Sequence, residues 1–313
     1  MAQRKLRNSH TKDKKVSSFE ILTLPQARSR KFVPAEFYSG VGGSTKVESL
    51  VEVNSLRDRI NWKQFLHSWQ IDPREFSLPD SERSEQVNKL LADANSLLDK
   101  MISANESVKV VAVEGDAYSV EDDIYFQGFD DNWIKLPMLR QTRVMPGKPA
   151  LCLADFVAPK EFRCKSTIQV FVASVGRGMY RRYVSDSTSY EGILADLLLS
   201  RLVEAATDFY HKNFGHAFVR YCGIRPAVGY PSMPDQSLVR IFDKILDYNS
   251  LDIEITENCA LFPSATTTGL IIVNREAKYF AIGQLTDDQR RDYAARRELS
   301  PDDLDKFLPM HNI

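Results

Sequence analysis

A proline-rich run at residues 223–235 restricts the fold of this chain more than any other segment. It contains Pro226, Pro231 and Pro234 together with two glycines. Each proline fixes its φ angle and lacks an N–H donor, and the residue before it is pushed out of the helical region. The run, here called the strap, is therefore predicted to be stiff and extended, with free backbone amides and carbonyls.

The strap also carries a cation and an aromatic ring, Arg225 and Tyr230. A guanidinium can hold a carboxylate through paired hydrogen bonds, and an extended backbone offers polar groups to a flat ring. These features suit a small zwitterion with a planar ring. Composition alone leaves open a plain proline-rich connector with a chance arginine.

Residues 190–213 give the clearest helix prediction, because apolar residues recur every three or four positions. Glu204, Asp208 and His211 follow one another on a different face of this helix. That face has two interpretations, a solvated polar surface or part of a ligand site.

The remaining pattern predicts helices and strands without a repeating βαβ period, which favours an α+β fold. Residues 33–53 are expected to be irregular, with a glycine turn near 40–43. The further predicted helices are 83–102 and 237–249, with another starting at Ser300, and the predicted strands are 108–113, 123–126, 253–255, 266–273 and 278–284.

The N-terminus is strongly basic. Residues 1–31 hold nine lysines and arginines against Asp13 and Glu20. With few large apolar groups, residues 1–32 are predicted to be a flexible tail, followed by a single domain over residues 33–313. Docking onto an acidic partner, or onto nucleic acid, is the alternative interpretation of this charge.

Composition argues against several classes of protein. The net charge of −1 gives no overall reason to expect nucleic acid or a membrane surface as partner. No apolar run approaches the ~18 residues that span a bilayer, and the start lacks a secretion signal, so a cytoplasmic protein is expected.

The four cysteines show no metal or disulfide spacing and are predicted to be buried free thiols. We identify no metal site and no catalytic residues.

Several segments, in order along the chain, closely resemble the activation domain of cobalamin-dependent methionine synthase. The strap resembles the S-adenosylmethionine-binding signature of that family. The other similar segments are residues 60–69, 92–100, 152–159, 190–205 and 288–296. Because the matches run from about residue 55 to 309, the chain is identified as a member of this family.

The resemblance implies a single C-shaped, helmet-like domain, with a twisted antiparallel sheet flanked by helices. It also implies a reactivation module that binds S-adenosylmethionine and supports reductive methylation of cob(II)alamin to methylcobalamin. The sequence lacks the cobalt-binding, zinc-binding and folate-binding parts of methionine synthase. The module is therefore expected to act in trans on a cobalamin-carrying methionine synthase chain that lacks its own activation domain. A flavodoxin or ferredoxin-like protein would supply the electron.

The resemblance further implies a set of ligand contacts. Arg225 would pair with the ligand carboxylate, Ala227 would offer its backbone to the adenine, and Gly229 would permit close approach. Tyr230 would lie near the corrin edge. The other implied contacts are Glu204, Asn61, Tyr279 and Phe280.

Two departures from the family pattern bear on ligand binding. Asn61 stands where the family has an aspartate expected to hold the ligand ammonium, a loss of about 1–2 kcal/mol. Gln236 replaces a histidine after Asp235. They leave open a non-catalytic docking or capping partner of a corrinoid protein, with weakened or lost S-adenosylmethionine binding. Service to a different corrinoid methyltransferase system is a third possibility.

Overall fold

The computed structural model describes residues 19–37, 42–214 and 223–308. Its centre is a six-stranded sheet in the order β10-β7-β3-β4-β5, with β2 also paired to β3, and all pairings are antiparallel. The predicted α+β class is confirmed. The strands of this sheet are β2 (Thr45–Glu52), β3 (Ser107–Val120), β4 (Asp123–Gln127), β5 (Trp133–Pro137), β7 (Ser166–Ser174) and β10 (Thr266–Ile272).

Strand β3 organises the sheet. It is 14 residues long, so β2 and β4 share one of its edges while β7 pairs along the other. Val110 and Ala112 belong to one hydrophobic core, and Val111 and Val113 belong to another. Because successive side chains point to opposite faces of a strand, both faces of the sheet are buried. This double burial explains the unbroken apolar run in the sequence.

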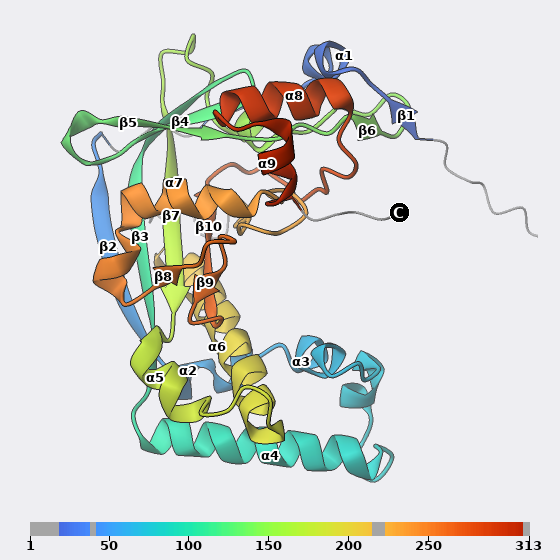
Figure 1. The fold of residues 1–313 in the computed structure, drawn as a ribbon, viewed down its shortest axis with the longest axis vertical. Helices are drawn as coiled ribbons and strands as arrows, with labels where there is room; N and C mark the ends of the chain where they lie inside the picture. Colours follow the sequence, from blue (N-terminus) through green and yellow to red (C-terminus); the bar gives the residue numbers. More distant parts are fainter. Residues whose placement is uncertain (1–18, 38–41, 215–222, 309–313) are drawn as a thin grey trace, which may run out of the picture.

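Helices cover both faces of the sheet. One core contains side chains of α2, α4 and α6, and the other contains side chains of α7. In Figure 1 the ribbon has a C shape, with α3 and α4 in the lower arm and α7, α8 and α9 in the upper arm. The helices are α1 (Leu24–Ser29), α2 (Val53–Leu56), α3 (Trp62–Ser68), α4 (Glu85–Ser103), α5 (Gly176–Tyr183), α6 (Tyr190–Phe214), α7 (Val239–Leu246), α8 (Asp287–Arg296) and α9 (Pro301–Asp305).

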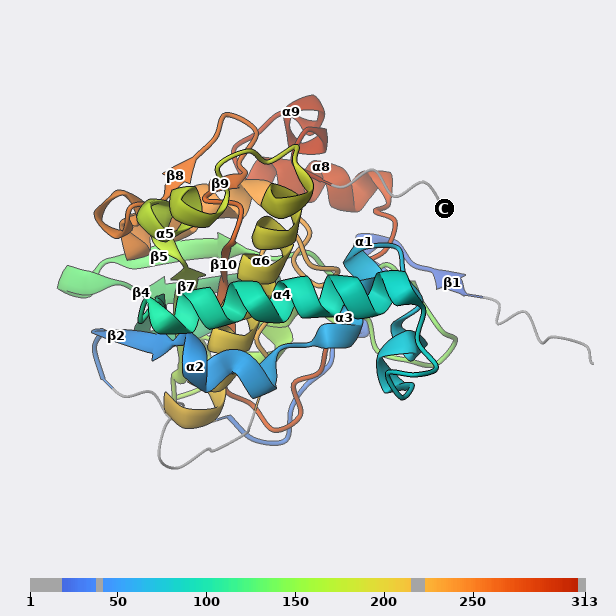
Figure 2. The ribbon, with the colours of Figure 1, turned by 90° about the horizontal axis from the view of Figure 1, so that it is seen from below.

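The strongly periodic helices are confirmed. Helix α4 begins after Ser84, whose side chain accepts a hydrogen bond from the N–H of Val87 (3.4 Å), and α6 matches the predicted 190–213. Figure 2, the view from below, shows α4 lying across the lower arm. The helix predicted over 237–249 is shorter, because Asp247 has a φ of 52° and ends α7.

Two predictions about strands are wrong. Residues 278–284 form no strand, because their backbone groups bond to scattered partners: the N–H of Ile282 donates to Pro231 and the carbonyl of Ala281 accepts from Gln141. Residues 45–52, expected to be irregular, form the edge strand β2. Most side chains of β2 are exposed or half-buried, which hid its strand character in the sequence.

The prediction of a flexible tail is wrong for residues 20–29. Residues 20–21 form β1 (Glu20–Ile21), which pairs with β6 (Arg143–Val144), and α1 follows. Leu22, Leu24 and Ala27 are buried, so this segment packs onto the upper arm. Residues 1–18 lie outside the described part of the chain.

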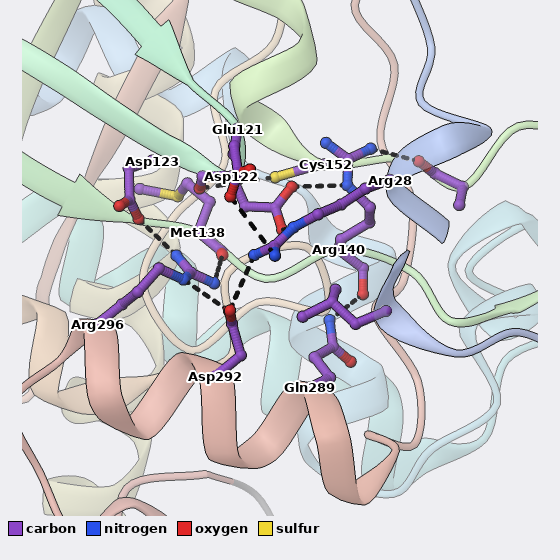
Figure 3. Close-up of polar contacts among 12 residues, drawn as sticks. Arg28, Glu121, Asp122, Asp123, Met138, Arg140, Cys152, Gln289, Asp292 and Arg296 are labelled. Atoms are coloured by element: carbon purple, nitrogen blue, oxygen red, sulfur yellow. Dashed lines mark hydrogen bonds and ion pairs between the residues drawn. The ribbon is translucent and has the colours of Figure 1, made fainter. Parts of the chain in front are cut away.

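A cluster of buried charges holds the upper arm together (Figure 3). Arg140 is 1% exposed; its Nε donates to Asp122 (2.7 Å) and its Nη2 to Asp155 (2.6 Å). Arg28 of α1 donates to the second oxygen of Asp122 (2.8 Å). In α8, Asp292 accepts from Arg28 at 3.0 Å. Five separate segments therefore share one network, here called the Arg140 cluster.

Two chemical expectations concern the cysteines and the membrane. Cys152 and Cys259 are buried free thiols, as predicted, whereas the free thiol Cys164 is only half-buried, and Cys222 lies outside the described residues. Burial raises the pKa of the Cys152 thiol, which keeps it protonated. Within the described ranges, no helix is both long and apolar enough to cross a bilayer.

We expect Arg140→Met to lower the free energy of unfolding by about 3–5 kcal/mol, because it leaves the buried Asp155 without its cation and the buried Asp122 with Arg28 alone. Urea unfolding followed by circular dichroism measures this change. Arg74→Met is the control, since Arg74 is 90% exposed beside Asp72 and its loss should leave the midpoint unchanged. Equal midpoints for both variants would contradict a central role for Arg140.

Candidate functional site

The strap lies along the free edge of β10. The N–H of Val228 donates to Thr268 (2.9 Å), and the N–H of Leu270 donates to Pro226 (2.9 Å). Gly269 stands opposite Ala227, and a side chain there would collide with the carbonyl of Pro226. This pairing leaves the N–H of Ala227 pointing away from β10, because the neighbours of Ala227 make the ladder bonds.

A tight turn at Gly229 redirects the strap. Gly229 has a φ of 85°, a conformation that favours glycine, and its N–H donates to Met233 (2.9 Å). A Cβ atom at this position would collide with the side-chain amide of Gln236. The strap ends at Asp235, which is fully buried and accepts hydrogen bonds from Tyr293 (2.8 Å) and Arg297 (2.9 Å) of the α8 region. The upper arm thus anchors the strap.

Arg225 is fixed between the strap and α6. Its Nη1 donates to the carbonyl of Thr207 (3.3 Å) and lies 3.7 Å from a carboxylate oxygen of Asp208. The side chain is 15% exposed. Because the contact with Asp208 is long, the guanidinium can also donate hydrogen bonds to the carboxylate of a ligand.

Tyr230 and Glu204 meet directly, as the hydroxyl of Tyr230 donates to the carboxylate of Glu204. The sequence predicted both as site residues but not their contact. Desolvation of the phenol by burial, and then the Glu204 carboxylate, raise the pKa of Tyr230. Tyr230 therefore stays protonated and serves as a donor.

Tyr279 and Phe280 have different surroundings. The hydroxyl of Tyr279 accepts a hydrogen bond from the backbone N–H of Arg225 (2.8 Å), and its side chain is 60% exposed. Phe280 is half-buried and packs against the core of the upper arm, which contains Ile282 and Tyr293. Only Tyr279 of this pair is bonded to the strap in the part of the chain described here.

Asn61 lies at the start of α3, in the lower arm. Its side-chain oxygen accepts from the N–H of Gln64 (3.0 Å), and the residue is exposed. The preceding segment contacts α6, where the guanidinium of Arg59 lies 4.8 Å from the ring centroid of Phe209. Asn61 is therefore the N-cap of α3. The segment before it packs against α6 near Thr207, the residue that Arg225 contacts.

A pocket of about 370 Å³ opens beside the Glu204–Tyr230 pair. It reaches Gln236 and the hydroxyl-rich strand β10, including Thr267 and Thr268. Sequence reasoning missed Arg201, which also lines the pocket. Its position, three residues before Glu204 on the same helical face, was the signal that could have found it.

Comparisons with known proteins identify the family of this chain. Residues 52–298 match the family described as vitamin B12 dependent methionine synthase, activation domain. The chain belongs to this family. A crystal structure of the MetH reactivation domain bound to AdoHcy is similar, with a TM-score of 0.77 and 26% sequence identity. That similarity covers 92% of this chain and 97% of the other.

The segments that resemble the family lie in two different parts of this activation domain, the candidate site and the Arg140 cluster. The strap contributes Arg225, Gly229 and Tyr230 to the candidate site. Residues 152–159 and 288–296 instead contribute Asp155 and Asp292 to the Arg140 cluster. A motif segment therefore need not be a ligand contact, and the second set acts by holding the upper arm in place.

We expect Gly229→Ala to lower the free energy of unfolding by about 1–2 kcal/mol, because the backbone of alanine would have to adopt the left-handed conformation there. The steric conflict with Gln236 should also disturb the turn. Chemical denaturation provides the measurement.

The matched control is Gly178→Ala in α5, where a Cβ atom would meet nothing within 4 Å. That variant should gain up to about 1 kcal/mol from helix propensity. Similar losses at both glycines would show that the turn imposes no special constraint.

Proposed function

We propose that this activation domain binds S-adenosylmethionine along the strap and supports reductive methylation of the cobalamin carried by a separate methionine synthase chain. The observation that carries the proposal is the fixed guanidinium of Arg225 beside outward-facing strap backbone. The similar MetH reactivation domain bound to AdoHcy, the demethylated counterpart of this ligand, supports the same ligand class.

The residues present fit the parts of the ligand. Arg225 would pair with the carboxylate, and the N–H of Ala227 would donate to the adenine. The oxygen of Asn61 could accept from the ammonium, although it also caps α3. Tyr279 would position Arg225 through the bond to its backbone. A contact from Phe280 remains a prediction, as does the place of Tyr230 near the corrin edge.

The protein would act by positioning and electrostatics, without a nucleophile or general base of its own. The sulfonium of the ligand, one external electron and the cobalt of the partner supply the methyl-transfer chemistry. The chain would hold the sulfonium close to the cobalt, and Glu204 would place negative charge near that cation. A cobalamin-binding methionine synthase chain is the proposed partner, with a flavodoxin or ferredoxin-like protein as electron donor.

A docking or capping partner of a corrinoid protein is the second candidate function. The neutral Asn61, whose oxygen already accepts from the α3 backbone, favours it. In that case the domain would bind the corrinoid protein without needing S-adenosylmethionine. Addition of the chain to cob(II)alamin-loaded methionine synthase lacking an activation domain, with ligand and reductant, distinguishes the two. Recovery of the methylcobalamin spectrum only in its presence supports reactivation in trans.

We expect Arg225→Ala to weaken S-adenosylmethionine binding by about tenfold or more, because a charge-assisted bond to the carboxylate is lost. Isothermal titration calorimetry on the purified chain measures the affinity. Arg181→Ala on α5 removes an exposed cation outside the candidate site and should bind as the wild type does. Unchanged affinity in a folded Arg225→Ala protein would refute the assigned role.

We expect Asn61→Asp to tighten S-adenosylmethionine binding by about tenfold, since a carboxylate would meet the ligand ammonium. Aspartate caps a helix as well as asparagine does, so the thermal midpoint should not fall. Titration of both proteins at low and high salt tests this, because the gain should shrink with screening. Equal or weaker affinity would mean that the ammonium is held elsewhere.

A further inference from the structure

We propose that a groove between α7 and α9 binds an acidic segment of a partner protein that carries a large apolar side chain. The groove has a volume of about 320 Å³. It shares no lining residue with the pocket beside Tyr230 and lies outside the site described above. The two helices that form it lie in the upper arm (Figure 1).

Two exposed cations of α7 form one wall. Arg240 and Lys244 are four residues apart, so they lie one helical turn from each other. Arg240 donates from Nε to the sulfur of Cys259 (3.1 Å) and from Nη2 to the carbonyl of Glu257 (3.0 Å). These bonds orient the guanidinium without neutralising it. Among the residues that the structure describes, neither cation has a carboxylate within ion-pair distance.

The other charges of the groove are already paired. The Nζ of Lys306 lies 2.7 Å from Asp303, and the Nε of Arg297 lies 2.9 Å from the buried Asp235. Asp303 is thus the carboxylate of the rim, and its own cation compensates it. The uncompensated charge of the groove is therefore positive, and it comes from α7.

The floor of the groove is apolar. Ile241, Leu299 and Phe307 line it and are half-buried against the cores below. An apolar centre with a polar rim is the usual anatomy of a protein interface, and rim charges select and orient the partner. An inorganic anion would make no use of this floor. A single-stranded nucleic acid would need aromatic rings for stacking, and the lining residues include only Phe307.

Peptide display tests the assignment without any cofactor, so its outcome is independent of the proposed function. Random peptides would be selected on the full chain and counter-selected on the R240Q/K244Q variant. We expect enriched sequences to place aspartate or glutamate beside leucine or phenylalanine. In fluorescence anisotropy, the best synthetic peptide should bind the double variant at least about tenfold more weakly than the wild type.

The matched control is K89Q/K100Q, which removes two exposed lysines from α4. It has the same net charge as R240Q/K244Q and should keep wild-type affinity for the peptide. Three results would overturn the proposal: no enrichment over the counter-selected variant, equal loss in both double variants, or tighter groove-dependent binding of a single-stranded oligonucleotide. A thermal melt of each variant confirms that the comparison is between folded proteins.

Discussion

The buried guanidinium of Arg140, held between Asp122 and Asp155, is the interaction on which the upper arm depends. A buried charge is tolerated only when its partners surround it, and here the partners come from the β3–β4 turn and from the segment after Cys152. Arg28 and Asp292 extend the cluster to α1 and α8. Because the α8 region also binds Asp235 at the end of the strap, the cluster fixes the position of the candidate site from a distance.

Local sequence patterns were sufficient to predict the helices and strands whose own residues carry a clear apolar spacing. Helices α4 and α6 have apolar residues at helical spacing, and β3 contains the apolar run 110–113. Elements defined by distant partners were missed. Arg28 was predicted to be part of a flexible basic tail. In the structure it pairs with the carboxylate of Asp122, which is 94 residues away in the sequence. The charge of a segment cannot show whether those charges are paired.

The candidate site, too, has parts that the sequence could predict and parts that it could not. The strap could be predicted because proline and glycine restrict the backbone regardless of context. The bonds of Tyr230 to Glu204 and of Tyr279 to the backbone of Arg225 could not, since each joins segments far apart in the sequence. Phe280 follows Tyr279 directly but packs into the core, because its ring has no polar group to reach the strap.

The pairing of the strap with β10 has a consequence for solubility. Strand β10 is rich in threonine, leucine and isoleucine, and an uncovered edge of such composition would offer unpaired backbone groups to other copies of the chain. Irregular, proline-containing backbone covers that edge and cannot itself pass the pairing on to a further strand. The strap therefore also protects the chain against intermolecular sheet growth, so sequence changes that loosen it would promote aggregation as well as disturb the candidate site.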